Sequence, residues 1–79
     1  MKKNRRELEK SDILHMQVRL FRLACKRWRM DTVTCAELFD LFRVDELIKD
    51  LYGLFHVQGD DANMDEIEAY LKARGVRKL

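Results

Sequence analysis

The chain of 79 residues has no proline, three glycines and two cysteines. Proline and glycine mark most turns, so their scarcity argues against collagen-like chains, flexible linkers and turn-rich β proteins. Two cysteines are too few for a disulfide framework. The chain also lacks an apolar run of 18 residues that could span a bilayer, and its N-terminus lacks the apolar stretch of a secretory signal. These absences predict a small cytoplasmic helical protein.

The short length argues against an enzyme. A domain of this size buries only about 60% of the surface that its unfolded chain exposes, which leaves little room for an enclosed catalytic cavity. The sequence holds no glycine-rich phosphate loop and no Gly-x-Ser-x-Gly turn. The potential zinc ligands Cys25, Cys35, His15 and His56 are not arranged in closely spaced pairs. We therefore expect no enzymatic activity, no cofactor and no metal.

Charge is unevenly distributed along the chain. Residues 1–30 contain ten Lys or Arg against three acids, a balance of +7, whereas residues 31–79 contain six against eleven, a balance of −5. Such asymmetry can mark a basic surface for nucleic acid, for an anionic membrane or for an acidic protein. It can equally be neutralised internally when one half folds onto the other.

Apolar periodicity predicts a long first helix from Ser11 to about Met30. Ser11 is the expected N-cap. Residues 1–10 are expected to be a basic tail or an exposed extension of the helix. The apolar stripe of this helix has spacings of four, three, four and three and consists of Leu14, Val18, Phe21, Cys25 and Trp28. Leu20, Leu23 and Ala24 widen it.

Three shorter helices are expected to follow. Thr34 and Glu37 form a capping box at the start of a helix that ends near Arg43. Asp45 is the expected cap of a third helix, which continues to His56. A loop over 59–62 precedes a last helix that begins with a capping box of Asn63 and Glu66 and ends at Gly75.

The predicted fold is all-α, a small compact bundle of about four helices, with a single domain over residues 11–75 and a C-terminal tail over 76–79. Its expected core comprises Leu14, Val18, Phe21, Phe39, Phe42, Ile48, Leu51, Tyr52, Phe55, Ile67 and Leu71. Cys25 and Cys35 are interpreted as small packing groups, with a disulfide or a metal site as alternatives.

A cationic stripe follows the first helix beside its apolar stripe. Its members recur at spacings of three, four and three and are Arg19, Arg22, Lys26 and Arg29, to which Arg27, Lys2, Lys3, Arg5 and Arg6 add charge. Such a stripe can follow a line of phosphates, with Trp28 stacking on a base or a cation. Alternatively, Trp28 belongs to the core, and the arginines cover it or pair with acids of the later helices.

Tyr52 and His56 lie one helical turn apart. An imidazole beside a phenol can act as an acid–base pair or titrate near neutral pH. Catalysis would also need a nucleophile, a metal or an oxyanion site, and the sequence supplies none in an evident pattern. His56 is therefore expected to close the third helix by hydrogen bonding to a carbonyl or an acid, with contact to a partner as the alternative. His15 is expected to be exposed or at a boundary.

Residues of the second, third and last helices carry a resemblance to a family; they are Thr34, Glu37, Phe42, Ile48, Tyr52, His56, Gly59, Ile67 and Tyr70. Over residues 12–73 the chain resembles the bacterial domain of unknown function family 3791. It departs from the family pattern in having Phe55 where Leu is usual and Val57 where Thr is usual. Members are often found beside predicted toxins that resemble ADP-ribosyltransferases, so the resemblance implies an antitoxin or accessory role.

The expected function is that of a non-enzymatic binding or regulatory module with a protein partner. Its expected contact residues are Arg19, Arg22, Lys26, Arg29, Tyr52 and His56. The alternative is a nucleic-acid-binding or autoregulatory protein that uses the basic face of the first helix. No contact with a membrane is expected.

Overall fold

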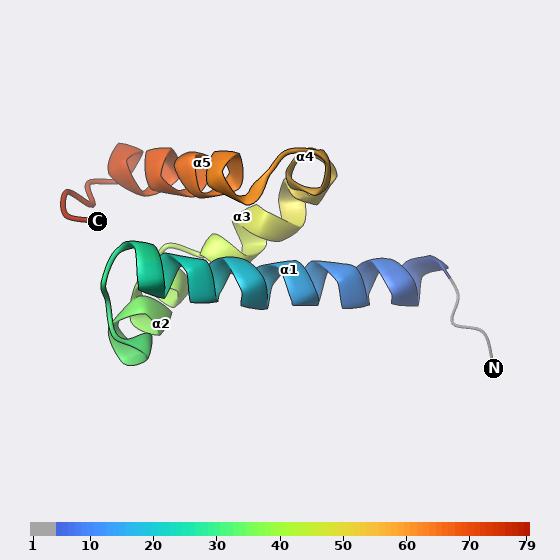
Figure 1. Ribbon diagram of the computed structural model, residues 1–79, viewed down its shortest axis with the longest axis horizontal. Helices are drawn as coiled ribbons and strands as arrows, with labels where there is room; N and C mark the ends of the chain where they lie inside the picture. Colours follow the sequence, from blue (N-terminus) through green and yellow to red (C-terminus); the bar gives the residue numbers. More distant parts are fainter. Residues whose placement is uncertain (1–4) are drawn as a thin grey trace.

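The computed structural model describes residues 5–79, which form five helices (Figure 1). These are α1 (Arg5–Arg27), α2 (Thr32–Leu41), α3 (Val44–Asp50), α4 (Tyr52–Val57) and α5 (Asp60–Ala73). This described part contains no strand, so the all-α prediction and its long N-terminal helix are confirmed. Residues 5–10 belong to α1, and residues 1–4 lie outside the described part.

The helix count is five instead of about four because the predicted third helix is broken at Leu51. The backbone of Leu51 leaves the helical region, with φ −99° and ψ 13°. Its N–H still bonds to the Leu47 carbonyl, and its own carbonyl accepts from Phe55. Figure 1 shows the resulting change of direction, with α3 running across the molecule and α4 seen nearly end-on. Backbone hydrogen bonds and the apolar pattern of the sequence both continue through Leu51. The pattern therefore does not reveal the bend.

The helix α1 is the axis of the molecule and contacts α2, α3 and α5. In Figure 1, α5 lies alongside α1 and runs in the same direction, while α3 passes behind them. The helix α2 packs near the C-terminal end of α1, and the first turns of α1 extend beyond the other helices. The C-terminal half of α1 is therefore the part that the rest of the chain surrounds.

The helix N-termini differ from the predicted caps. Asp31 caps α2, and its Oδ1 accepts a hydrogen bond of 2.7 Å from the Thr34 N–H, so the proposed capping box of Thr34 and Glu37 is wrong. An Asp at this position satisfies one of the free N–H groups of the first turn. Three other predicted cap residues lie within helices, namely Ser11 in α1, Asp45 in α3 and Asn63 in α5.

The last helix begins earlier than predicted, with Gly59 as its N-cap and Asp60 in its first turn. Two negative charges are favourable at this helix start, since Asp60 and Asp61 face the positive end of the helix dipole. The expected loop over 59–62 is thus replaced by the beginning of α5.

The helices α1 and α5 end in the same way, with a residue of positive φ and two backbone hydrogen bonds back into the last turn. Gly75 has φ +97°, and the N–H groups of Gly75 and Val76 bond back to the carbonyls of Lys72 and Leu71, as predicted for a glycine that ends a helix. Arg29 takes the equivalent place after α1, with φ +52°. Arg43, which follows α2, also has a positive φ, of 55°.

The core uses a different face of α1 from the one predicted. The residues of the described part that are buried and hydrophobic are Met16, Leu20, Ala24, Trp28, Cys35, Phe39, Val44, Ile48, Phe55, Met64, Ile67 and Leu71. We call Met16, Leu20 and Ala24 of α1, together with Trp28 directly after the helix, the buried stripe. Leu14 and Val18 are 58% and 42% exposed, so their prediction as core residues is wrong. Phe21, Phe42, Leu51 and Tyr52, also predicted as core, are partly buried.

Aromatic rings pack α2 against the C-terminal half of α1. The Phe39 ring contacts Phe21 edge-on at a centroid distance of 5.2 Å and lies 6.2 Å from the Trp28 ring. The Trp28 indole N–H donates a hydrogen bond of 3.1 Å to Glu68 of α5. Trp28 therefore connects α1 to both α2 and α5, as in the interpretation that assigned it to the core.

Candidate functional site

Leu14 and Val18 form an exposed apolar stripe on the side of α1 that faces away from the buried stripe. They lie one helical turn apart. Together with Gln17, Phe21 and Asp45 they line a small hollow of about 170 Å³ between α1 and α3. We call Leu14 and Val18 the exposed stripe. These two aliphatic side chains present apolar surface to solvent next to the hollow.

The hollow carries an acidic group. Partial burial raises the pKa of the Asp45 carboxyl, because desolvation penalises its charged form. The Gln17 amide donates to the backbone carbonyl of Asp45 at 2.9 Å. Within residues 5–79 the Asp45 carboxylate has no ion-pair partner. It can therefore accept a cationic group from outside.

Basic residues border the other side of the exposed stripe. An open groove of about 420 Å³ runs along α1 and is lined by His15, Val18, Arg19, Arg22, Leu23 and Lys26. Arg22 and Lys26 are exposed and make no ion pair within the described part of the chain. The exposed stripe thus lies between one partly buried acid and two bases that make no ion pair in the described part of the chain.

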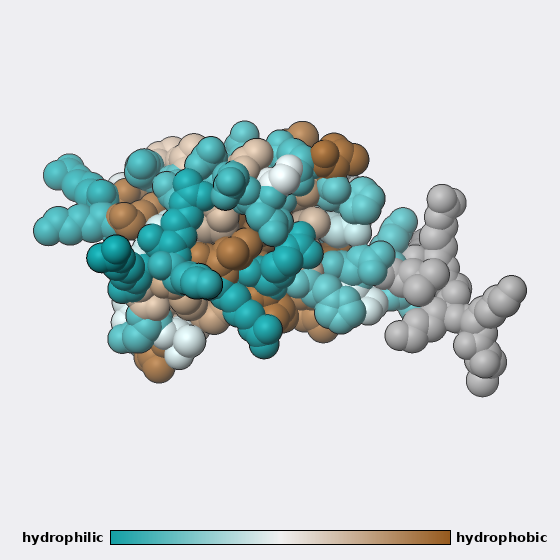
Figure 2. All heavy atoms as spheres, in the orientation of Figure 1, coloured by the Kyte–Doolittle hydropathy of each residue, from teal (hydrophilic) through white to brown (hydrophobic). Residues whose placement is uncertain are grey.

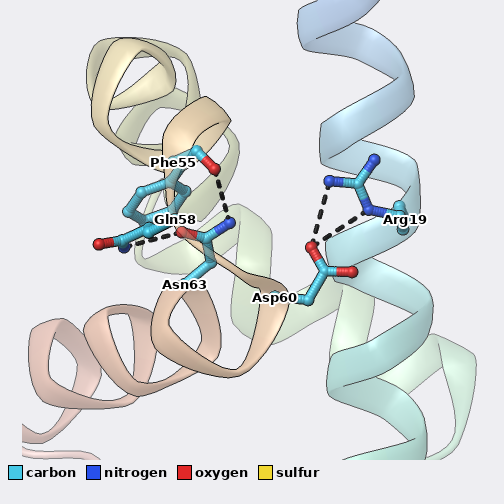
Figure 3. A network of polar contacts seen from close by, with 5 residues as sticks. All are labelled: Arg19, Phe55, Gln58, Asp60 and Asn63. Carbon is cyan, nitrogen blue, oxygen red and sulfur yellow. Dashed lines mark hydrogen bonds and ion pairs between the residues drawn. The ribbon is translucent and has the colours of Figure 1, made fainter.

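Other cations of α1 are already neutralised by α5. Arg19 donates from Nε and from a terminal nitrogen to Asp60, at 3.3 and 3.2 Å (Figure 3). Arg27 bonds Asp65 at 2.7 Å and Glu68 at 2.8 Å. The charge asymmetry of the sequence is therefore partly cancelled inside the domain. The cationic stripe predicted from the sequence reduces to Arg22, Lys26 and Arg29, since Arg19 is paired.

Another groove lies between α1 and α5. It measures about 640 Å³ and is lined by Leu23, Lys26, Arg27, Asp60, Asp61, Met64 and Asp65. On the face that Figure 2 shows, hydrophobic side chains are visible in the middle and hydrophilic ones surround them. Ion pairs between Arg27 and α5 cross this region, so the groove is a mixed surface with an internally balanced charge.

Tyr52 and His56 lie together in a cleft between α1 and α4. Their rings are stacked, with centroids 5.5 Å apart and an interplanar angle of 25°. The cleft measures about 310 Å³ and is also lined by Asp12, His15, Met16, Arg19, Phe55 and Gln58. The expected hydrogen bond from His56 to a carbonyl or an acid does not occur among the described residues. His15 is exposed, as predicted.

The cleft brings Arg19, Tyr52 and His56 together, but Arg22, Lys26 and Arg29 lie elsewhere on the surface. Within residues 5–79 no group of three His, Cys, Asp or Glu side chains is arranged to hold a metal ion. Between Arg5 and Leu79 no helix combines the length and the apolar character needed to cross a membrane. The side chains of Lys2, Lys3, Arg5 and Arg6, expected to extend the cationic stripe, lie outside the described part.

Sequence reasoning missed the exposure of Leu14 and Val18 and the position of Asp45 beside them. One signal was present: α1 has more apolar residues than one helix face can bury, with Leu20 and Ala24 outside the predicted stripe. Two apolar faces on one helix mean that one of them can stay exposed when the other packs. No comparable signal marks Asp45, since its position beside α1 depends on how α3 packs.

No protein-family model matches the chain, and neither a curated protein nor a solved structure matches it. The resemblance to domain of unknown function family 3791 therefore stays a prediction.

Proposed function

We propose that the protein is a non-enzymatic binding module that contacts another protein through the exposed stripe of α1. The observation that supports this most strongly is the exposure of Leu14 and Val18 on a helix whose opposite side is fully packed. Water contact with two large aliphatic groups at helical spacing is unfavourable, and a partner that covers them gains that free energy.

The charges beside the exposed stripe define the chemistry of the partner. Asp45 on one side favours a partner Lys or Arg, and Arg22 with Lys26 on the other side favours Asp or Glu. An amphipathic helix with aliphatic residues between a basic edge and an acidic edge meets these requirements. Opposite charges on the two sides also fix the direction in which such a helix binds.

The resemblance to domain of unknown function family 3791 suggests which protein supplies this surface. We propose an antitoxin or accessory role, in which the partner is an ADP-ribosyltransferase-like toxin encoded beside this protein. Binding by a small, preformed helical domain is compatible with such a role because inhibition then needs contact and no catalysis.

Nucleic-acid binding is the second candidate, supported by the free cations Arg22, Lys26 and Arg29. Two observations weigh against it. Trp28 is buried and bonded to Glu68, so it does not stack on bases, and Arg27 is neutralised by α5. The remaining positive surface is short, and acidic side chains of α5 lie close to it.

The test uses Val18→Asp and, as a matched control, Val33→Asp on the exposed side of α2, where Val33 is 67% exposed. Tagged wild-type protein and both variants are used to capture partners from the native host, and the captured toxin-like protein is then purified for titration calorimetry. Val18→Asp should lose about 2 kcal/mol or more of partner affinity, and Val33→Asp should keep wild-type affinity. Equal affinity of all three proteins would refute the proposed contact surface.

A DNA titration of the same wild-type protein separates the two candidates. A protein-binding module should give no shift of duplex DNA at physiological salt. Sub-micromolar affinity at about 150 mM salt, with a salt dependence that weakens in Arg22→Gln, would favour the nucleic-acid function instead.

A further inference from the structure

The two cysteines of the chain lie on adjacent helices that pack against each other. Cys25 is in the last turns of α1 and Cys35 in the first turns of α2. Cys35 is buried, whereas Cys25 is partly exposed at the edge of the same core. Both are free thiols.

The aromatic contacts place both cysteines at the interface between α1 and α2. The Phe39 ring of α2 contacts the ring of Phe21 on α1 and lies close to that of Trp28, directly after α1. Cys25 is one turn from each of these two residues, and Cys35 is one turn before Phe39, so both cysteines occupy this interface. In agreement with this placement, the Cys25 thiol contributes to the raised pKa of Cys35, an effect that requires the two side chains to lie close together.

The two thiols differ in reactivity. Burial, and then the contact with Cys25, raises the pKa of the Cys35 thiol to about 12, so it is almost entirely protonated at neutral pH. The thiolate is the form that attacks a disulfide or a peroxide. Cys25 is therefore the thiol that an oxidant meets first, because it is partly exposed and Cys35 is buried.

We infer that Cys25 and Cys35 are a redox pair that closes to an intramolecular disulfide across the α1–α2 interface. This site is independent of the exposed stripe, which lies nearer the N-terminus of α1. In a reducing compartment the pair stays open and packs as two small apolar groups, and a rise in the disulfide content of the surroundings closes it.

The oxidant is a low-molecular-weight disulfide. The Cys25 thiolate attacks one of its sulfurs, which forms a mixed disulfide and releases one small thiolate. Cys35 then loses its proton, and its sulfur attacks the Cys25 sulfur, which releases the second small thiolate. The two protons lost by the cysteines convert the two small thiolates to thiols. The protein is oxidised by two electrons and the small disulfide is reduced by two.

The bond would close the nine residues 26–34, which contain the turn after α1 and the N-cap Asp31. Closing a loop of this size restricts the unfolded chain and should raise the melting temperature by roughly 10 °C in so small a domain. The disulfide changes no surface charge. Lys26 and Arg29 therefore stay exposed and charged, while the turn between α1 and α2 becomes covalently closed.

The test treats the purified full-length protein with glutathione disulfide at neutral pH and follows the intact mass and the melting temperature. The wild type should lose about 2 Da, should gain roughly 10 °C in melting temperature, and should revert on addition of dithiothreitol. Cys35→Ser should stop at the mixed disulfide, about 305 Da heavier, and Cys25→Ser should not react, because Cys35 is buried and protonated.

Three outcomes would overturn the inference. Wild-type protein that keeps both thiols, or that halts at the mixed disulfide as Cys35→Ser does, would show that the sulfurs cannot meet. A disulfide between two chains, seen as a dimer on a non-reducing gel, would place the reactive contact elsewhere. Wild-type mass and melting temperature decide the question even where a serine variant is unstable.

Discussion

The two apolar stripes of α1 have similar residue types and opposite environments. The buried stripe packs against α2, α3 and α5, and its member Leu20 is fully buried. The exposed stripe lies about half a turn round the helix, with Leu14 58% exposed. The difference teaches that periodicity identifies which residues share a helix face, whereas the rest of the chain decides which face it covers.

The stripes also differ in how their polar neighbours are satisfied. On the buried side, Trp28 donates to Glu68, and within the described part no buried side-chain nitrogen or oxygen lacks a partner. On the exposed side, Arg22 and Lys26 are unpaired and the pKa of Asp45 is raised. On the buried side every buried polar side-chain atom of the described part is hydrogen-bonded. On the exposed side charged groups remain that a second molecule can pair with.

The largest expected effect contrasts truncation in the two stripes. Leu20→Ala should lower the free energy of unfolding by about 2–5 kcal/mol, since it leaves a cavity between helices. Leu14→Ala removes the same atoms from a mostly exposed position and should change the free energy of unfolding by about 0.5 kcal/mol or less. Urea unfolding followed by circular dichroism measures both. Similar losses for the two variants would mean that the exposed stripe is part of the core.

A smaller effect is expected directly after α1, where the buried stripe ends at Trp28. Arg29 has φ +52°, a conformation that costs about 1 kcal/mol or more for a residue with a Cβ. Arg29→Gly removes that strain, and the greater freedom of glycine in the unfolded chain offsets part of the gain. Thermal melting should show a stabilisation below about 1 kcal/mol.

The matched control for Arg29→Gly is Arg22→Gly, in the interior of the same helix. It removes the same side chain and should destabilise by about 1 kcal/mol, because glycine is unfavourable within a helix. If both glycine variants destabilised the protein, the left-handed conformation after α1 would not be a source of strain.

The smallest expected effect concerns the acid beside the exposed stripe. A carboxyl whose pKa is raised in the folded state disfavours folding when charged, so its contribution to stability falls as pH rises through the raised pKa. Asp45→Asn should therefore melt at a slightly higher temperature than the wild type at pH 7. The difference should vanish at acidic pH, where the wild-type carboxyl is protonated.

The position of Asp45 keeps this effect small. It lies in the first turn of α3, where the helix dipole favours a negative charge and offsets part of the desolvation. A variant that is less stable than the wild type at pH 7 would show that the dipole outweighs desolvation, and that Asp45 supports folding.

Much of the core beyond α1 could be predicted from the sequence. Ile48, Phe55, Ile67 and Leu71 are buried as expected, because each short helix has one apolar face and little choice of which to bury. The end of α5 was predictable too, since a glycine after the last periodic residue is a specific chemical signal.

The side of α1 that packs could not be predicted, because both of its apolar stripes fit a helical period. The bend at Leu51 was hidden for a similar reason, since the apolar pattern continues through it without proline. Thr34 is the cap of α2 that the sequence predicts, but Asp31 takes this position, and both residue types suit it.

Of the candidate site, the cationic members were visible in the sequence, but their partners were not. Whether Arg19 pairs with Asp60 or stays free depends on how α5 lies beside α1, a contact between residues 41 positions apart. The stacking of Tyr52 on His56 follows from their spacing within α4. The cleft that they share with His15 required the packing of α4 near α1.

The buried side-chain amide of Asn63 couples the local unfolding of α4 to that of the start of α5. A helix of six residues has no independent stability in water, and the last turn of α4 leaves carbonyls without helical partners. Asn63 donates to the Phe55 carbonyl at 3.0 Å and accepts from the Gln58 amide at 2.8 Å (Figure 3). Backbone amides of α4 and of the first turns of α5 should therefore exchange with solvent through one shared opening event. The cleft that Tyr52 and His56 line should therefore open together with the start of α5.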